Sequence, residues 1–428
     1  MKSDPVLVLS APFMMRKLLH DQWLKPSELR KLQDKRLRGI VKHSYENVPY
    51  YRNVFKQAKI TPNDIKTTDD LTKIPILTKK DLKNLTLDKI CATNVDLTQC
   101  LKEGTSGSSG TPLFVFWTKK AKIDCYLRAL RWQLKCGDKI SNKQAVLAAG
   151  WLLTHPIQRI GIFRTKYISG INETQAIIEQ LKKFKPDTLV TLPSFIILLG
   201  KEIKENPSNQ ISIKHAFVGG EMIDEYSRRI CKETFNVDLH ECYGANEVGF
   251  LAAQCPERII QHTEADTRFI EIIKNNQRAA QGEEGDIVVT NLTNYATPLI
   301  RYNLEDLGML LDDECSCGSS FPLFKITLGR KSDIITLPNN KTVSAVTVYT
   351  LLIPIEGIKQ FQLVQERKDT FRVKIVKDSR FSNSTRQEIA SVLEQRLGRT
   401  KINIELVDDI PREKSGKFKQ FKMEIPIE

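Results

Sequence analysis

Residues 173–193 read ETQAIIEQLKKFKPDTLVTLP. The first half of this stretch places Ile177, Ile178 and Leu181 on one face of a helix, and the second half is a short apolar run typical of a buried strand. Similar strand-like runs occur between about residues 145 and 330, namely AVLAAG, HAFVGG, VDLHECYG and GDIVVTNL. Strands that alternate with helical segments in this way predict an α/β domain.

The two ends of the chain extend this domain. Residues 22–58 begin with an amphipathic helix, which Pro49 is expected to end. The last hundred residues contain the strand-like runs KQFQLVQE, TFRVKIVK and INIELVDD. A helix is predicted near 384–397, where Ser384 and Gln387 can form a capping box and Gly398 ends the helix. The sequence thus predicts a large N-terminal α/β domain, residues 1–328, and a small α+β C-terminal domain, residues 329–428.

Composition excludes several classes of protein. The chain has 428 residues, 41% of them hydrophobic, which is enough for more than one buried core and too apolar for a disordered protein. No apolar stretch approaches the ~20 residues that span a bilayer, and the first residues do not predict a secretory signal, so a cytoplasmic location is expected. Nine scattered cysteines favour a reducing compartment. The net charge of +14 is spread along the chain without a nucleic-acid-binding pattern, so no nucleic acid is expected as partner.

The stretch EGTSGSSGTP, residues 103–112, is the strongest local signal for ligand binding. Its glycines let a ligand approach the backbone N–H groups, and its hydroxyls can donate to anionic oxygens, so it predicts a phosphate-binding loop. The candidate residues are Thr105, Ser106, Gly107, Ser108, Ser109, Gly110 and Thr111. The loop matches neither the Walker A motif nor GxGxxG, and taken alone it is equally consistent with a surface turn.

Four further motifs follow this loop in order: YGANE at 243–247, PLIRYNLEDL at 298–307, GRKSD at 329–333 and PREKSGKFKQ at 411–420. As a set they resemble the motifs of the AMP-forming, adenylate-forming ligase superfamily. The segments VPYYRNVF and DLTKIP, with the chain length, resemble its phenylacetate-CoA ligase and CapK-like branch. The chain departs from the usual motifs at Asn246 (usually Thr), Glu305 (usually Gly) and Ser332 (usually Asp).

This resemblance implies an ATP-dependent ligase that converts a carboxylic acid to an acyl-adenylate and then transfers the acyl group to a thiol, while the C-terminal domain acts as a lid. It implies that Lys417 is catalytic and bridges carboxylate and α-phosphate, and that Glu247 holds Mg²⁺. The loop would hold the ATP phosphates and Asp306 the ribose. The other implied nucleotide-binding residues are Gly219, Gly220, Glu221, Tyr243, Gly244 and Arg330.

Substrate and acceptor are less defined by the sequence. Trp151, Pro193, Phe195 and Tyr243 are candidates for an apolar acid-binding pocket and could equally be core residues. In this branch the acid is expected to be aromatic or another small organic acid. CoA is the expected acceptor, and a carrier-protein phosphopantetheine or an amine is the alternative; a homodimer is also compatible with the sequence. The three departures leave open a non-catalytic protein that only binds nucleotide.

Cys255, His262, Cys315 and Cys317 form a second constellation. Three thiols and one imidazole suit a closed, tetrahedral Zn²⁺ site with a structural role. Because C-x-C is less typical of such sites than C-x-x-C, four unliganded residues are the alternative.

Overall fold

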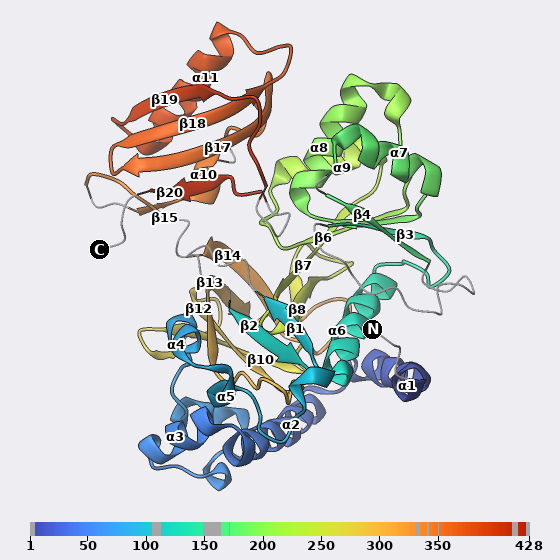
Figure 1. Cartoon of the computed structure of the whole chain (residues 1–428), viewed down its shortest axis with the longest axis vertical. Helices are drawn as coiled ribbons and strands as arrows, with labels where there is room; N and C mark the ends of the chain where they lie inside the picture. Colours follow the sequence, from blue (N-terminus) through green and yellow to red (C-terminus); the bar gives the residue numbers. More distant parts are fainter. Residues whose placement is uncertain are drawn as a thin grey trace. The chain divides into compact units, whose positions relative to one another are not determined.

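The structure is a computed structural model that describes residues 5–104, 113–148, 164–170, 172–330, 334–339, 342–349, 351–412 and 418–424 (Figure 1). Contacts divide the chain into two compact units. Unit 1 contains Met1–Ile140 and His240–Thr327, and unit 2 contains Ser141–Leu239 and Leu328–Glu428. One division between the units, at 327/328, lies one residue before the domain boundary predicted at 328/329. Unit 2 also includes a segment from the middle of the chain. The division into two domains at this boundary stays a prediction.

The N-terminal part of unit 1 is helical. Its α-helices are α1 (Pro5–Asp21), α2 (Pro26–Asn47), α3 (Pro49–Ala58), α4 (Lys79–Asn84), α5 (Leu87–Ile90) and α6 (Lys119–Lys135), with 3₁₀ turns η1 (Pro62–Asp64), η2 (Thr68–Lys73) and η3 (Leu97–Gln99). Helix α2 buries Leu29, Leu37 and Ile40 along one face, as its periodicity predicts. It ends before Pro49, which becomes the first residue of α3, where its missing N–H costs no helical hydrogen bond.

The strands of unit 1 are antiparallel wherever their register is defined. They are β1 (Leu101–Gly104), β2 (Phe114–Trp117), β7 (Leu239–Ala245), β8 (Gly249–Gln254), β9 (Gln261–Thr263), β10 (Arg268–Lys274), β11 (Gln277–Arg278), β12 (Gly285–Asn291), β13 (Tyr302–Leu311) and β14 (Leu323–Arg330). Strands β1 and β2 form a hairpin, and the others follow the order β11-β10-β12-β13-β14-β9-β8-β7. One large core joins these strands to α2 and α3 through residues such as Phe55, Trp117 and Phe324.

In unit 2 four parallel strands form the order β6-β5-β3-β4. They are β3 (Gln144–Ala148), β4 (Thr165–Ser169), β5 (Thr188–Thr191) and β6 (His215–Gly219), with helices α7 (Thr174–Phe184), α8 (Pro193–Glu205) and α9 (Glu225–Phe235) and the 3₁₀ turn η5 (Pro207–Asn209). Figure 1 shows these three helices beside one another in green. Ile177, Ile178 and Leu181 are buried on α7, so the mixed α/β class predicted from this region is confirmed. The predicted alternation ends with α9, because residues 239–330, all of them described, contain strands without helices.

The C-terminal part of unit 2 is a small α+β unit. It contains the hairpin β15 (Ile334–Thr336) and β16 (Thr342–Ser344), then α10 (Ala345–Tyr349), β17 (Ile358–Arg367), β18 (Thr370–Lys377), α11 (Asn383–Leu397), β19 (Lys401–Leu406) and β20 (Phe421–Met423). Strands β17 and β18 pair antiparallel, and β20 and β19 add parallel edges. The predicted cap of α11 was wrong by two residues, because Ser382 rather than Ser384 accepts the hydrogen bond at the N-cap. Gly398 ends the helix with φ +76°, as predicted.

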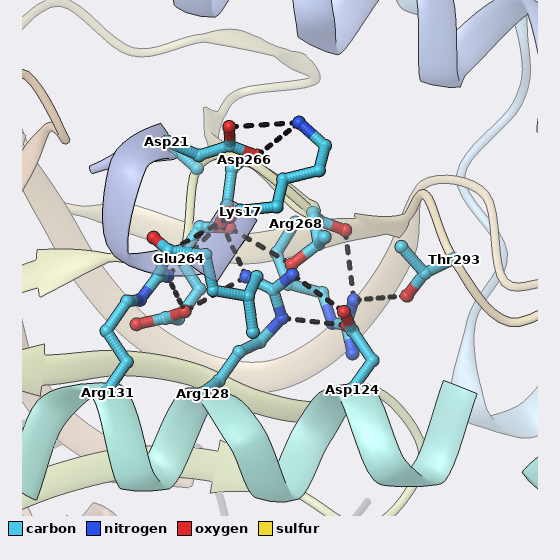
Figure 2. A network of polar contacts seen from close by, with 12 residues as sticks. Lys17, Asp21, Asp124, Arg128, Arg131, Glu264, Asp266, Arg268 and Thr293 are labelled. Atoms are coloured by element: carbon cyan, nitrogen blue, oxygen red, sulfur yellow. Dashed lines mark hydrogen bonds and ion pairs between the residues drawn. The ribbon is translucent and has the colours of Figure 1, made fainter. Parts of the chain in front are cut away.

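A buried charge network fixes α1 and α6 against the strands of unit 1 (Figure 2). Arg128 on α6 is fully buried and donates to Asp124 at 2.8 Å and to Asp266 at 2.6 Å. Arg131 donates to the other Asp266 oxygen at 3.1 Å and to the Leu18 carbonyl of α1 at 2.8 Å. Burial alone would raise the pKa of Asp266, but the two guanidinium groups outweigh it and hold that pKa well below its ordinary value. The carboxylate therefore stays charged and holds both arginines.

Among the described residues, no helix combines the length and the apolar composition needed to cross a bilayer.

Candidate functional site

Several of the predicted site residues lie outside the described part of the chain. These are loop residues 105–111, Trp151 and the predicted catalytic Lys417, while Arg330 is described only through its backbone at the end of β14. The strands on either side of the loop are described, and they pair in register from Leu101 with Trp117 to Gly104 with Phe114. Strands β1 and β2, which flank the predicted loop in the sequence, are therefore antiparallel neighbours.

Asn246 joins the YGANE motif to the start of this loop. It follows directly after β7, and its side-chain Nδ2 donates to the backbone carbonyl of Gly104 at 2.9 Å. Gly104 is the last described residue before the loop. The departure from the usual threonine therefore supplies a hydrogen bond that ties the two predicted nucleotide-binding motifs together.

Hydrogen bonds bring the central acidic residues of two motifs to one place in unit 1. The hydroxyl of Tyr243 on β7 donates to Asp306 Oδ2 on β13 at 2.6 Å. The hydroxyl of Tyr302, also on β13, donates to Glu247 Oε1 at 3.3 Å. Burial and the neighbouring Glu247 raise the pKa of Tyr302, so its proton remains available for this bond. Each of the two motifs thus supplies a tyrosine that donates to the acidic residue of the other. The roles of these residues in nucleotide binding stay predictions.

Glu305, the residue that stands where the related motif usually has glycine, has a positive φ. Its φ of +65° lies in the left-handed region, where glycine is the usual residue and other residues are strained. The backbone N–H of Glu305 donates to Asn303 Oδ1 at 2.8 Å, which holds this turn, and the residue is exposed. Glu305 therefore adopts the left-handed backbone conformation that glycine reaches without strain.

A second group of predicted residues surrounds Glu221 in unit 2. Gly219 ends β6 and Gly220 has φ +81°, which glycine adopts without strain. The carboxylate of Glu221 accepts hydrogen bonds from the backbone N–H of Ser194 at 2.9 Å and from that of Phe418 at 3.0 Å. Phe418 directly follows the predicted catalytic lysine in the sequence. Glu221 therefore links the end of β6 to the C-terminal motif.

Pro193 and Phe195 begin helix α8 next to this group. Pro193 occupies the first turn of α8, and Phe195 is buried in the core of the parallel sheet. The guanidinium of Arg412, from the C-terminal motif, lies 3.9 Å from the centre of the Phe195 ring and donates to Ser194 Oγ at 3.0 Å. Cation and ring attract each other at this distance. The role of Pro193 and Phe195 in an acid pocket stays a prediction.

The four residues of the predicted metal site lie together in unit 1. Cys255 follows β8, His262 is in β9, and Cys315 and Cys317 belong to the segment between β13 and β14. Their ligand atoms all lie within 4.8 Å of one another. The Sγ atoms of Cys255 and Cys315 are 3.6 Å apart, and Cys317 Sγ is 3.3 Å from His262 Nε2.

The surroundings of His262 suit a metal ligand. Its Nδ1 lies 2.7 Å from the Phe321 carbonyl, which can only accept, so Nδ1 carries the proton and Nε2 presents a lone pair to the cysteines. Burial lowers the pKa of His262 to about 4, which keeps the ring neutral at pH 7. Gly318, with φ +76°, allows the tight turn that follows the C-x-C pair.

The sequence reasoning missed Lys79 and the contact between Glu221 and Phe418. Lys79 is the first residue of α4, and its Nζ lies 3.8 Å from Glu247 Oε1. Nothing in the surrounding segment ILTKKDL marks Lys79 as a site residue. Both contacts join residues far apart in the sequence, and nothing in their local patterns indicates the pairing.

The chain is similar in sequence to one protein family and to several ligases of known function. The family model for the CapK C-terminal domain matches residues 335–424. The phenylacetate-coenzyme A ligase of Thermus thermophilus is 27% identical over 385 residues, which cover 86% of each chain. The enzyme of the same name from Escherichia coli is 29% identical over 301 residues, 66% of this chain and 68% of its own.

A solved structure of 2-hydroxyisobutyryl-CoA ligase in the postadenylation state matches with a TM-score of 0.76 and 18% identity, over 94% of this chain and 90% of its own. The same ligase with CoA in the thioesterification state matches with a TM-score of 0.63 and 20% identity, over 94% and 91%. The fold is therefore that of the adenylate-forming CoA ligases. The chain is similar over most of its length to phenylacetate-CoA ligases, and its C-terminal part matches the CapK C-terminal domain, which confirms the resemblance predicted from its motifs.

Proposed function

We propose that the chain is an AMP-forming acid–CoA ligase. It uses ATP to activate an aromatic or other small carboxylic acid and passes the acyl group to the thiol of CoA. The observation that carries this proposal is a pair of hydrogen bonds between the same two motifs: Tyr243 donates to Asp306, and Tyr302 donates to Glu247. The homology to phenylacetate-CoA ligases supports both the activation step and the choice of acceptor.

In the first step a carboxylate oxygen of the acid attacks the α-phosphorus of ATP. The bond from this phosphorus to the bridging oxygen breaks, and pyrophosphate leaves. Negative charge builds up on the phosphoryl oxygens, so groups that stabilise it lower the barrier. Lys417 is assigned to the α-phosphate and the carboxylate, loop residues 105–111 to the β- and γ-phosphates, and Asp306 to the ribose hydroxyls.

Glu247 is the residue assigned to Mg²⁺. The positive charge of this ion would offset the negative charge of the phosphates. The carboxylate of Glu247 is buried, with the ammonium of Lys79 nearby and the hydroxyl of Tyr302 as a hydrogen-bond donor. The site therefore already accommodates positive charge beside this carboxylate. Oxygen donors of this kind are the ligands that Mg²⁺ prefers. Gly219, Gly220 and Glu221 are assigned to the adenine side. Tyr243, Gly244 and Arg330 are also assigned to the nucleotide, Arg330 near the start of the C-terminal domain. The carboxylate of Glu221 is occupied by Ser194 and Phe418, so its backbone is the part assigned to the nucleotide.

In the second step the sulfur of CoA attacks the carbonyl carbon of the acyl-adenylate, and the bond to the AMP oxygen breaks. The products are the thioester and AMP. A carrier-protein phosphopantetheine or an amine is the alternative acceptor, and its nucleophilic atom would attack the same carbonyl carbon.

The relatives act on phenylacetate and on 2-hydroxyisobutyrate according to their names. We assign an aromatic acid first, because the phenylacetate-CoA ligases to which the chain is similar are named for one. Trp151, Pro193, Phe195 and Tyr243 stay candidates for the acid-binding residues. A homodimer and a cytoplasmic location stay predictions.

Incubation with ATP, Mg²⁺, CoA and phenylacetate tests this function. The proposal predicts that AMP and an acyl-CoA form in equal amounts and only when an acid is present, as measured by chromatography of both products. Acid-dependent AMP formation without a CoA product would favour the other acceptors. Binding of ATP without acid-dependent AMP formation, over a panel of aromatic and aliphatic acids, would instead support a non-catalytic nucleotide-binding protein.

We also propose that Cys255, His262, Cys315 and Cys317 bind one structural Zn²⁺. The convergence of three thiols and one neutral imidazole within 4.8 Å supports this assignment. Such an ion would tie the segment that contains Cys315 and Cys317 to strands β8 and β9 and so hold this edge of unit 1.

Protein purified without chelators is predicted to contain about one zinc per chain, as measured by emission spectroscopy. The His262→Ala and Cys317→Ser variants should lose the metal and melt several degrees lower, because binding to the folded state alone stabilises it. Cys100→Ser is the matched control, since Cys100 is partly buried and lies outside the cluster. Wild-type protein without zinc would remove this site from the proposal.

A further inference from the structure

Lys79 lies in the candidate active site although it belongs to none of the predicted motifs. Its Nζ is 3.8 Å from Glu247 Oε1, and the exposed fractions of the two side chains are only 16% and 7%. The hydroxyl of Tyr302 donates to the same carboxylate oxygen. A lysine this well buried usually has a partner, and here the partner is the residue assigned to Mg²⁺.

The chain builds this position with several hydrogen bonds. The backbone N–H of Leu77 donates to the Arg301 carbonyl at 2.9 Å, and the N–H of Asn303 donates to the Leu77 carbonyl at 2.9 Å. These two bonds form a parallel bridge between Leu77 and Tyr302, the neighbour of Glu247. Arg301, which has φ +50°, also donates from its guanidinium to the Ile74 carbonyl at 2.7 Å.

The start of helix α4 fixes the next two residues. Thr78 is the N-cap, and its Oγ1 accepts from the backbone N–H of Asp81 at 3.1 Å, while its hydroxyl donates to the Asp81 carboxylate at 2.6 Å. Lys79 is therefore the first residue of a capped helix that is attached to β13. Its side chain reaches Glu247 from a backbone that is held on both sides.

We infer that Lys79 is a second cation of the nucleotide site: it neutralises Glu247 in the free chain and moves to the triphosphate when Mg²⁺·ATP occupies that carboxylate. This inference rests on the proposed function. The lysine ammonium is a compact charge on a flexible stem, which suits an exchange between two anionic partners. A purely structural ion pair is the alternative, and the two roles differ in their effects on metal and nucleotide binding.

Opposite effects on two probes test the inference. In Lys79→Met the carboxylate of Glu247 loses its competing cation, so Mn²⁺ alone, measured by electron paramagnetic resonance without nucleotide, should bind several-fold tighter. Mg²⁺·ATP, measured by calorimetry, should bind about 10-fold more weakly or worse, because a charged hydrogen bond to phosphate is lost. Lys79→Arg retains a cation and should restore most of the affinity for Mg²⁺·ATP.

Lys80→Met is the matched control, because Lys80 is the next residue on the same helix and is exposed. It should change neither affinity, and melting temperatures of all variants identify any that fail to fold. Unchanged binding of Mg²⁺·ATP by folded Lys79→Met would overturn the inference, as would unchanged binding of Mn²⁺. A wild-type protein that does not bind Mg²⁺·ATP would instead contradict the proposed function, on which the inference depends.

Discussion

Lys417→Ala is expected to lower acid-dependent ATP–pyrophosphate exchange by about 10²–10³-fold, the usual effect of removing a group that stabilises transition-state charge. The same variant should convert a supplied acyl-adenylate and CoA to thioester at close to the wild-type rate. The two half-reactions differ because charge on the α-phosphate increases only in the first, and Lys417 is assigned to that charge. Each half-reaction can be measured separately, the first by radiolabel exchange and the second by chromatography of the thioester.

Lys422→Ala is the matched control for this variant. Lys422 lies five positions later on β20 and is exposed, so its removal should leave both half-reactions unchanged. Equal losses in both half-reactions of Lys417→Ala would contradict the assignment. Such a result would indicate that Lys417 affects substrate binding or the fold instead of the adenylation step.

Arg128→Met is expected to lower the free energy of unfolding by about 3–5 kcal/mol, the usual cost when one partner of a buried ion pair is removed. The substitution would leave Asp124 and Asp266 without their strongest donor in the network of Figure 2. Methionine nearly fills the space of the aliphatic stem, so the loss reports the charge and not a large cavity. Urea unfolding, with the midpoint and slope fitted together, measures this change.

Lys120→Met tests whether the effect is specific to the network. Lys120 is exposed near the start of the same helix, so its replacement should change stability by less than about 0.5 kcal/mol. If Arg128→Met were as stable as this control, the network would contribute little to the fold. The large predicted difference follows from the complete burial of Arg128.

The sequence predicted the parallel part of unit 2 well because its signals are local. The spacing of Ile177, Ile178 and Leu181 defines a helix face, and the apolar run at 188–191 defines the strand that follows. The antiparallel strands of residues 239–330 were less predictable. Their apolar runs resemble those of buried parallel strands, and only pairing over long distances in the chain distinguishes the two. Ser382 and Ser384 show the same limit at small scale, because both can cap α11 and tertiary packing selects one.

The candidate site shows a similar division. Glu247, Asp306 and Tyr243 were predicted because they belong to motifs whose order in the chain resembles that of known ligases. The structure supports their grouping through the hydrogen bond from Tyr243 to Asp306. Lys79 could not be predicted, because only the bridge between Leu77 and Tyr302 brings it to Glu247. The role of a residue such as Lys79 can be inferred only from the tertiary structure.

ATP–pyrophosphate exchange with a panel of aromatic acids, fatty acids and amino acids is the most direct test of the proposed activity. The proposed mechanism predicts exchange that depends on Mg²⁺ and on one class of acid, with aromatic acids first. That result would establish acyl-adenylate formation and identify the substrate class. ATP binding without exchange for any acid in the panel would contradict the proposal that this chain activates such acids.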